Sequence, residues 1–134
     1  MMPRIANLAS TKKKQGFSAS DLKRSTDDKH PKFSLELVQP GFDVRDCKDR
    51  NDRGNLMMTL SDMSKMPWFE IKRLDRHKKG FETIEELRER LPQKLRDMTP
   101  IAFRFSDMKP VIGVRVEDVF YIVWIDHDMK LYKH

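Results

Sequence analysis

The chain has 134 residues, which predicts one domain with a single hydrophobic core. No apolar run approaches the roughly 18–20 residues that a helix needs to cross a bilayer, and no apolar stretch follows the N-terminal lysines, so we expect neither a membrane span nor a secretory signal. The single cysteine, Cys47, excludes an intrachain disulfide and a thiolate cluster for zinc, and it indicates a reducing, cytoplasmic location in a bacterium or virus.

The formal net charge of +6 is concentrated at the N-terminus. The first 32 residues carry eight Lys or Arg and three Asp, whereas the other 102 carry 19 basic and 18 acidic side chains. Residues 1–31 also lack periodic apolar positions and cannot bury enough surface to offset their ordering entropy. We therefore expect a flexible, disordered basic arm at 1–31 and a single domain at 32–134. The Lys12–Lys14 run either contacts a phosphate or acidic partner, or only keeps the chain soluble.

The first predicted elements of the domain are a strand and a helix. Residues 32–38 alternate between apolar and polar side chains, which predicts a strand at an edge of the sheet. Apolar residues then recur at helical spacing, which predicts a helix over about 46–63. Asp43 or Asp46 can cap this helix, because a carboxylate there accepts a hydrogen bond from a free backbone N–H.

Two further helical segments are predicted next. Ser64 can cap a second helix that has Pro67 in its first turn. That helix ends before Gly80, which can supply a closing residue in the left-handed region. Thr83-Ile-Glu-Glu86 has the pattern of a capping box and predicts a third, short helix that ends at Pro92.

The last third of the chain predicts three strands in succession, at 101–105, 110–116 and 119–125. Short polar turns separate these runs, which is typical of an antiparallel meander. The third run is apolar at every position, which indicates a central strand covered on both faces. The complete prediction is an α+β fold with one N-terminal strand, two to three helices and a three-stranded antiparallel meander that forms one sheet.

The first two strands of this meander each carry an arginine on the face opposite their apolar residues. These arginines are Arg104 and Arg115. If both apolar faces turn toward one core, the two guanidinium groups project together from the other side of the sheet. There they can hold phosphodiester oxygens or stabilise charge that develops during transesterification. The alternative is a pair of surface arginines matched to carboxylates such as Glu36.

A basic cluster precedes Gly80 and consists of Lys72, Arg73, Arg76, His77, Lys78 and Lys79. Such a cluster predicts phosphate binding, and His77 can transfer a proton near neutral pH. The alternative is that basic side chains favour the end of a helix because they offset its dipole. Near the C-terminus, Tyr132 and His134 can add a hydroxyl and an imidazole to the same surface.

The sequence lacks the motifs of the common cofactor and metal sites. It has no phosphate-cradling glycine loop, no HExxH, no paired-cysteine site and no nucleophile elbow. His127 stands between Asp126 and Asp128 and can ligate a metal, but a polar turn explains this triplet better. We therefore expect no metal and no cofactor.

The order of elements and the end of the chain resemble the RelE/ParE superfamily of small bacterial toxins, over about residues 32–134. The stretches that carry the resemblance are Ile101-Ala-Phe-Arg-Phe105, Val111-Ile-Gly-Val-Arg115 and Phe120-Tyr-Ile-Val-Trp-Ile-Asp-His-Asp-Met-Lys-Leu-Tyr132. RelE-type members cleave mRNA in the ribosome without a metal, by activating the ribose 2′-hydroxyl. The resemblance implies that role for the nearest matches, which are Arg104, Arg115, His77, Lys79 and Tyr132.

Three features depart from the family. The helix at 83–91 is an insertion, the domain lacks the usual strong positive charge, and the basic arm is extra. ParE-type members act on DNA gyrase rather than on RNA, so the fold alone does not decide the activity.

We expect a toxin-like protein of bacterial or phage origin that binds or cleaves RNA, with RNA or the ribosome and an antitoxin protein as partners. Arg104 and Arg115 would hold phosphate, and His77 or Tyr132 would transfer the proton. The residues expected to bind RNA are Arg73, Arg76, Lys78 and Lys79. The alternative is a non-catalytic interaction protein of phage or mobile-element origin that binds a partner protein through its sheet edge or its arm.

Overall fold

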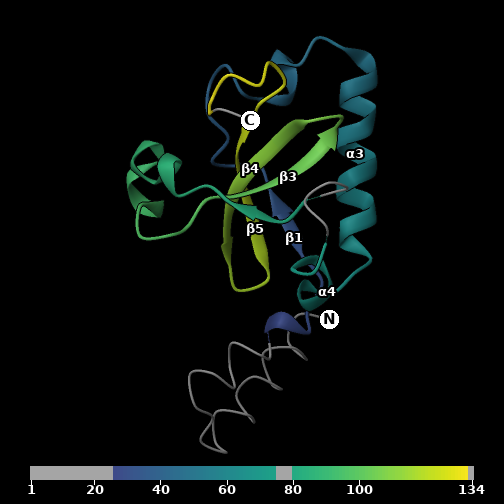
Figure 1. The fold of residues 1–134 in the computed structure, drawn as a ribbon, viewed down its shortest axis with the longest axis vertical. Coiled ribbons are helices and arrows are strands. Elements are labelled where there is room, and N and C mark those ends of the chain that lie inside the picture. Colours follow the sequence, from purple (N-terminus) through teal and green to yellow (C-terminus); the bar gives the residue numbers. More distant parts are fainter. Residues whose placement is uncertain (1–25, 75–79, 133–134) are drawn as a thin grey trace, which may run out of the picture.

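Five strands form one mixed sheet in the order β1-β5-β4-β3-β2 (Figure 1). The computed structural model describes residues 26–74 and 80–132. β1 pairs in parallel with β5, and the other neighbours are antiparallel. The strands are β1 (Lys32–Ser34), β2 (Glu82–Thr83), β3 (Ile101–Ser106), β4 (Lys109–Val116) and β5 (Val119–Ile125). The α+β class is confirmed, and β1 lies at an edge of the sheet, but the sheet has five strands rather than the predicted meander with one edge strand, because β2 extends its other edge.

A β-bulge in β5 changes which side chains share a face. Ile112 pairs with Trp124, whereas Gly113 pairs with Ile122, so Val123 is an extra residue in the strand. The bulge turns Val123 and Trp124 toward the same core. Strict alternation, which would place Trp124 on the face of Ile122 and Ile125 on the face of Tyr121, therefore fails at these two residues.

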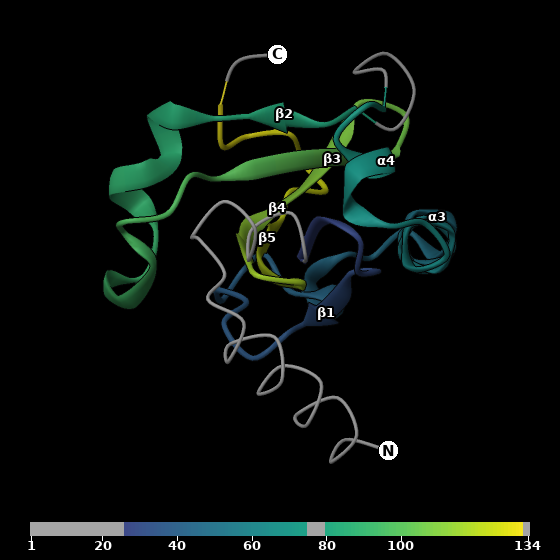
Figure 2. The ribbon, with the colours of Figure 1, turned by 90° about the horizontal axis from the view of Figure 1, so that it is seen from below.

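Two helices cover one face of the sheet, namely α3 (Arg50–Ser64) and α4 (Trp68–Ile71) (Figure 2). Asp49 caps α3, because its carboxylate accepts hydrogen bonds from the backbone N–H groups at positions 51 and 52. The predicted start at 46 is too early, since Asp43 caps a separate 3₁₀ turn, η1 (Val44–Asp46). The predicted cap of the second helix is also wrong, because Pro67 occupies that position.

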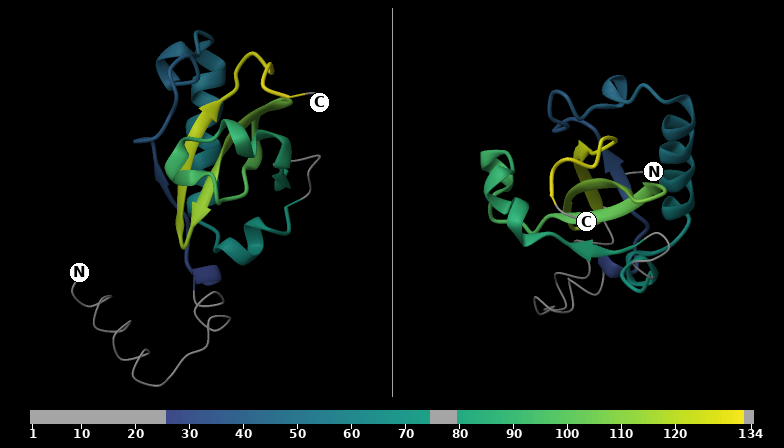
Figure 3. Two further views of the ribbon diagram at one scale, coloured as in Figure 1. Left: turned by 90° about the vertical axis from the view of Figure 1, so that its left-hand side faces the viewer. Right: turned by 45° about the horizontal axis from the view of Figure 1, so that its top comes forward.

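Two 3₁₀ segments cover the opposite face, namely η2 (Glu85–Arg90) and η3 (Gln93–Leu95) (Figures 2 and 3). The third α-helix that we predicted at 83–91 is therefore a 3₁₀ segment. Thr83 does not cap it, because this residue pairs with Ile101 in the sheet. Gly80 lies in the left-handed region with φ +62°, as predicted.

Each face of the sheet has its own hydrophobic core. On the helical side, Phe103 and Phe120 pack with ring centroids 5.4 Å apart, and the fully buried Trp68 lies next to them. On the other side, Leu87 and Trp124 belong to a second cluster. Because both faces are covered, the sheet is the middle layer of the molecule.

Residues 26–31 already contact the domain. The backbone N–H of Trp68 donates to the carbonyl of Lys29, and Pro31 is buried. β1 ends at Ser34, four residues before the predicted end. The rest of the predicted basic arm, residues 1–25, lies outside the described residues. None of the helices in the described ranges is long and apolar enough to span a membrane.

Candidate functional site

Arg104 and Arg115 lie on opposite faces of the sheet. Arg104 pairs with Pro110 across the two strands, so both side chains lie on the same face. Ile112, two residues after Pro110, shares that face and belongs to the core beneath the 3₁₀ segments. Arg115 pairs with Phe120, which belongs to the core on the helical side. The expected joint site of the two guanidinium groups is therefore not formed.

Arg115 is held by neighbours within the protein. Its guanidinium carbon lies 4.4 Å from the centre of the Trp68 ring. Its Nη2 atom lies 2.6 Å from a carboxylate oxygen of Asp27, and its Nε–H donates to the carbonyl of Glu117 at 2.6 Å. The side chain is 15% exposed. The carboxylate that pairs with it is Asp27, not Glu36 as in the alternative that we weighed from the sequence.

Arg104 lies beside Tyr132 at the edge of the sheet that carries β2. Both side chains line a small cavity of about 20 Å³, together with Gly80, Glu82, Ala102, Phe103 and Pro110. Arg104 is half-buried, and it forms no ion pair or hydrogen bond through its side chain with any residue that the structure describes.

Tyr132 is held in its protonated form. Burial, followed by the charges of Glu82 and Asp126, raises the pKa of its hydroxyl to about 12, although Arg104 acts in the opposite direction. A phenol with such a pKa cannot act as a general base near neutral pH. It can donate a hydrogen bond or a proton.

The predicted basic cluster is only partly described. Arg73 is exposed, and its guanidinium carbon lies 5.9 Å from the centre of the Phe69 ring. Lys72 forms an ion pair with Asp27. Arg76, His77, Lys78 and Lys79 lie outside the described residues, as does His134. Their proximity to Arg104 remains a prediction.

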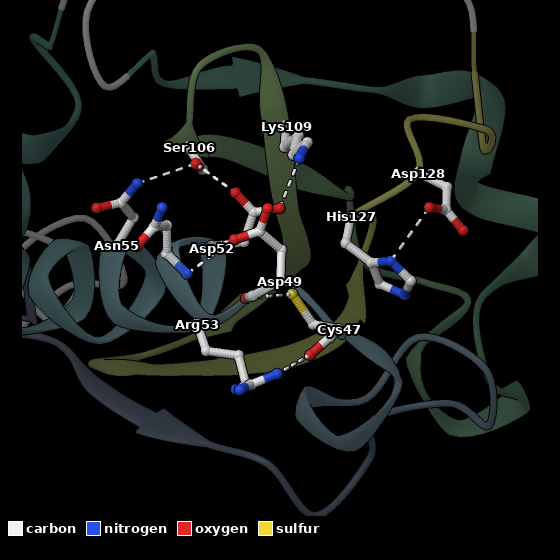
Figure 4. Close-up of polar contacts among 10 residues, drawn as sticks. Cys47, Asp49, Asp52, Arg53, Asn55, Ser106, Lys109, His127 and Asp128 are labelled. Carbon is white, nitrogen blue, oxygen red and sulfur yellow. Dashed lines mark hydrogen bonds and ion pairs between the residues drawn. The ribbon is translucent and has the colours of Figure 1, made fainter.

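A larger pocket of about 450 Å³ lies between the start of α3 and the turn after β5 (Figure 4). Deep in it, the ammonium of Lys109 lies 2.5 Å from Asp52, and the hydroxyl of Ser106 donates to the same carboxylate at 2.7 Å. Asn55 donates to Ser106 at 3.0 Å and so joins α3 to the end of β3. The residues that line the pocket are Gly41, Asp46, Cys47, Lys48, Asp49, Asp52, Lys109, His127 and Asp128.

The ion pair in this pocket fixes the charge of both partners. The hydrogen bond from Lys109 holds the pKa of Asp52 below its usual range, against the effect of burial. The same hydrogen bond raises the pKa of Lys109. Both groups are therefore charged at neutral pH, and each neutralises the other.

The pocket does not present an activated nucleophile. Cys47 is 1% exposed, and burial, followed by the charge of Asp52, raises the pKa of its thiol, so the thiol remains protonated. His127 has Nδ1 3.3 Å from a carboxylate oxygen of Asp128, whereas its Nε2 is buried and has no hydrogen-bond partner among the residues that the structure describes.

No local pattern indicates this pocket, because Asp52 and Lys109 are 57 residues apart. We interpreted His127 and its neighbours as a polar turn, and Met129 in that turn has a positive φ of 54°. Among residues 26–74 and 80–132, no three His, Cys, Asp or Glu side chains are arranged to hold a metal ion. Comparison of the chain with protein-family models, curated proteins and solved structures gives no match.

Proposed function

We propose that the protein is a toxin-like RNA-binding protein that cleaves RNA without a metal, at the cavity of Arg104 and Tyr132. The observation that carries the proposal is a half-buried guanidinium that is paired with no other described residue and lies beside a neutral phenol. Burial strengthens the attraction between a guanidinium and an anion, and the planar fork of arginine fits phosphate oxygens. The proposal also draws on the resemblance of the sequence to RelE/ParE toxins.

In the proposed mechanism, Arg104 binds a non-bridging oxygen of the scissile phosphate and stabilises the charge that develops there. The ribose 2′-oxygen attacks phosphorus and the bond to the 5′-oxygen breaks, which leaves a 2′,3′-cyclic phosphate. Tyr132, which stays protonated near neutral pH, donates its proton to the leaving 5′-oxygen. We propose His77 as the acceptor of the 2′-hydroxyl proton. Arg115 is removed from the mechanism, because Asp27 and Trp68 hold it on the other face.

The test is induced expression in bacteria, with growth and mRNA integrity followed over time. We expect the wild type to arrest growth and cleave mRNA. Arg104→Ala should lower cleavage by about 100-fold or more, since it removes the group that stabilises the transition state. Tyr132→Phe should lower it by about 10- to 100-fold, since it removes only the proton donor.

Arg45→Ala is the matched control. The Arg45 side chain is 85% exposed and forms a surface ion pair with Asp43 at 3.6 Å, which contributes little to stability. It should arrest growth like the wild type. Full cleavage by a folded Arg104→Ala variant would contradict the proposed site, and a wild type that neither arrests growth nor cleaves mRNA would contradict the proposed activity.

A second function is favoured by exposed apolar side chains. Met57 and Met58 on α3 are 67% and 64% exposed, and Met108 in the β3–β4 turn is 42% exposed. Flexible methionines suit an adaptable protein interface. The chain would then be a non-catalytic interaction protein, with the outer edge of β1 as another contact site. A stable complex recovered from cells, together with intact mRNA, would support this function over the first.

A further inference from the structure

Two cations meet on one carboxylate where the first described residues reach the helical side of the sheet. Arg115, from β4, has Nη2 2.6 Å from Oδ1 of Asp27. Lys72, which follows α4, has Nζ 3.1 Å from Oδ2 of the same residue. The side chains of Asp27 and Arg115 are 20% and 15% exposed, whereas that of Lys72 is 42% exposed, so the cluster opens to solvent on the side of Lys72.

Arg115 is oriented by groups other than Asp27. Its guanidinium lies over the ring of Trp68, and its Nε–H donates to the carbonyl of Glu117. Trp68 is itself fixed, because it is fully buried and its indole N–H donates to the carbonyl of Asp118 at 3.1 Å. The guanidinium would therefore keep its position if the carboxylate moved away.

The charge of Asp27 does not fully balance the charge of these two cations. Arg115 and Lys72 together carry two positive charges, whereas the carboxylate carries one negative charge. Its pKa lies below the usual range, because these two cations outweigh the effect of burial. Arg115 lies 2.6 Å from Oδ1 and Lys72 lies 3.1 Å from Oδ2, so each carboxylate oxygen faces one cation. A dianionic phosphate would balance the charge and offer more acceptor oxygens.

Asp27 can withdraw without unfolding the segment that follows it. The carbonyl of Lys29 accepts from the backbone of Trp68 at 2.9 Å, and the N–H of Lys32 donates to Asp118 at 3.0 Å. The ring of His30 also contacts the carbonyl of Ser64 at 2.9 Å. These contacts anchor the chain from residue 29 onward, so the withdrawal of Asp27 breaks only the backbone hydrogen bond from Lys29 to the carbonyl of Thr26 among the backbone contacts of residues 29–32.

We propose that Arg115 and Lys72 form an anion-binding site, which Asp27 occupies as an internal ligand and which a phosphate group takes in its place. Because Asp27 is covalently attached, its effective concentration at the site is high, and external phosphate binds weakly to the wild type. The site lies on the opposite face from Arg104, so it does not depend on the proposed function, and either can fail alone.

The experiment compares Asp27→Asn with Asp28→Asn. The first variant removes the charge of the internal ligand, and the second removes the same charge from an exposed neighbour that forms no ion pair within the described chain. Thermal unfolding is followed in increasing inorganic phosphate, against chloride at equal ionic strength. A ligand that binds only the folded state raises the melting temperature in proportion to its occupancy. We expect Asp27→Asn to bind phosphate at least about tenfold more tightly than the wild type and Asp28→Asn.

Adding Lys72→Gln to Asp27→Asn should abolish the gain in phosphate affinity, because one of the two cations is then lost. If Asp27→Asn folds in phosphate but not in chloride, that rescue also supports the site. Equal responses of Asp27→Asn and Asp28→Asn would overturn the proposal, as would an Asp27→Asn variant that stays unfolded in both salts. The phosphate group can come from nucleic acid or from free phosphate, and a single-stranded RNA oligomer at the same concentration of phosphate groups separates these two sources. Tighter binding of the oligomer identifies nucleic acid as the ligand, and equal binding identifies free phosphate.

Discussion

Asp52 accepts hydrogen bonds from two side chains that are distant in the sequence, Lys109 and Ser106, and its own side chain is 8% exposed. This carboxylate joins α3 to the β3–β4 turn. Since the pair is mostly buried, the loss of one charge leaves the other without a partner in a site of low polarity. The contact therefore contributes to stability mainly by satisfying groups that folding has already removed from water.

We predict that Asp52→Asn lowers the free energy of unfolding by about 2–4 kcal/mol, because it leaves the ammonium of Lys109 without its counter-charge. Urea denaturation followed by circular dichroism measures the change. Asp62→Asn is the control, since this residue is exposed on the same helix and its removal should change stability by less than about 0.5 kcal/mol. Equal effects of the two substitutions would show that the ion pair contributes nothing specific.

At the scale of the elements, the hairpin of β4 and β5 depends on a glycine. A Cβ atom built on Gly113 would lie 2.0 Å from the carbonyl oxygen of Tyr121, which is backbone and cannot move aside freely. Gly113 is also the residue where the pairing shifts register. The missing side chain is therefore what lets the two strands come close next to the bulge.

We predict opposite effects for two Gly→Ala substitutions. Gly113→Ala should lower the melting temperature strongly, by an amount equivalent to about 3 kcal/mol or more, because the strands must separate or distort. Gly54→Ala should raise stability by up to about 1 kcal/mol, since a Cβ there meets nothing within 4 Å and alanine favours the helix interior. Thermal unfolding of both variants checks the pair, and a neutral Gly113→Ala would contradict the close approach.

The type and order of the elements could be predicted from hydrophobic spacing, but their ends and their partners could not. The helix at 46–63 is α3, and the last three strands pair as antiparallel neighbours. The predicted strand at 32–38 ends early at Ser34, and its parallel pairing with β5 leaves no local signal. The segment at 83–91 has a capping-box sequence, yet pairing of Thr83 in the sheet prevents the cap from forming.

The candidate site could be predicted only in part, for a physical reason. Alternation placed Arg104 and Arg115 correctly within their own strands, opposite the apolar residues. It could not show that the two apolar faces pack into different cores, because that depends on both faces of the sheet being covered. Asp27, which pairs with Arg115, lies 88 positions earlier in a segment that we assigned to the arm.

At the scale of the whole molecule, the shifted pKa values predict how stability depends on pH. Both Asp27 and Asp52 have a pKa below the usual value of about 4 in the folded state. Such groups contribute stability above their unfolded pKa, and this is lost as the pH falls through the folded pKa. Lys109 and Tyr132 have raised pKa values, so the stability that they contribute is lost as the pH rises above about 10.

We therefore expect a stability plateau between about pH 5 and pH 10, and a decline below it. The double variant Asp27→Asn/Asp52→Asn should be less stable at pH 7 but should show a shallower decline toward pH 2. Urea unfolding at a series of pH values measures both slopes. A double variant with the same acid slope as the wild type would contradict the assignment of the decline to these carboxylates.

The parallel contact of β1 with β5 joins residues near the two ends of the domain, with Lys32 opposite Val119. Because β1 has no other strand neighbour within residues 26–74 and 80–132, this edge of the sheet cannot form until the last strand has left the ribosome. The chain between β1 and β5 must also close into a long loop before these strands can pair, which slows folding relative to a helical protein of the same size. In a nascent chain that ends before β5, Phe33 and Phe103 therefore lack Phe120, the aromatic ring against which both pack in the finished fold.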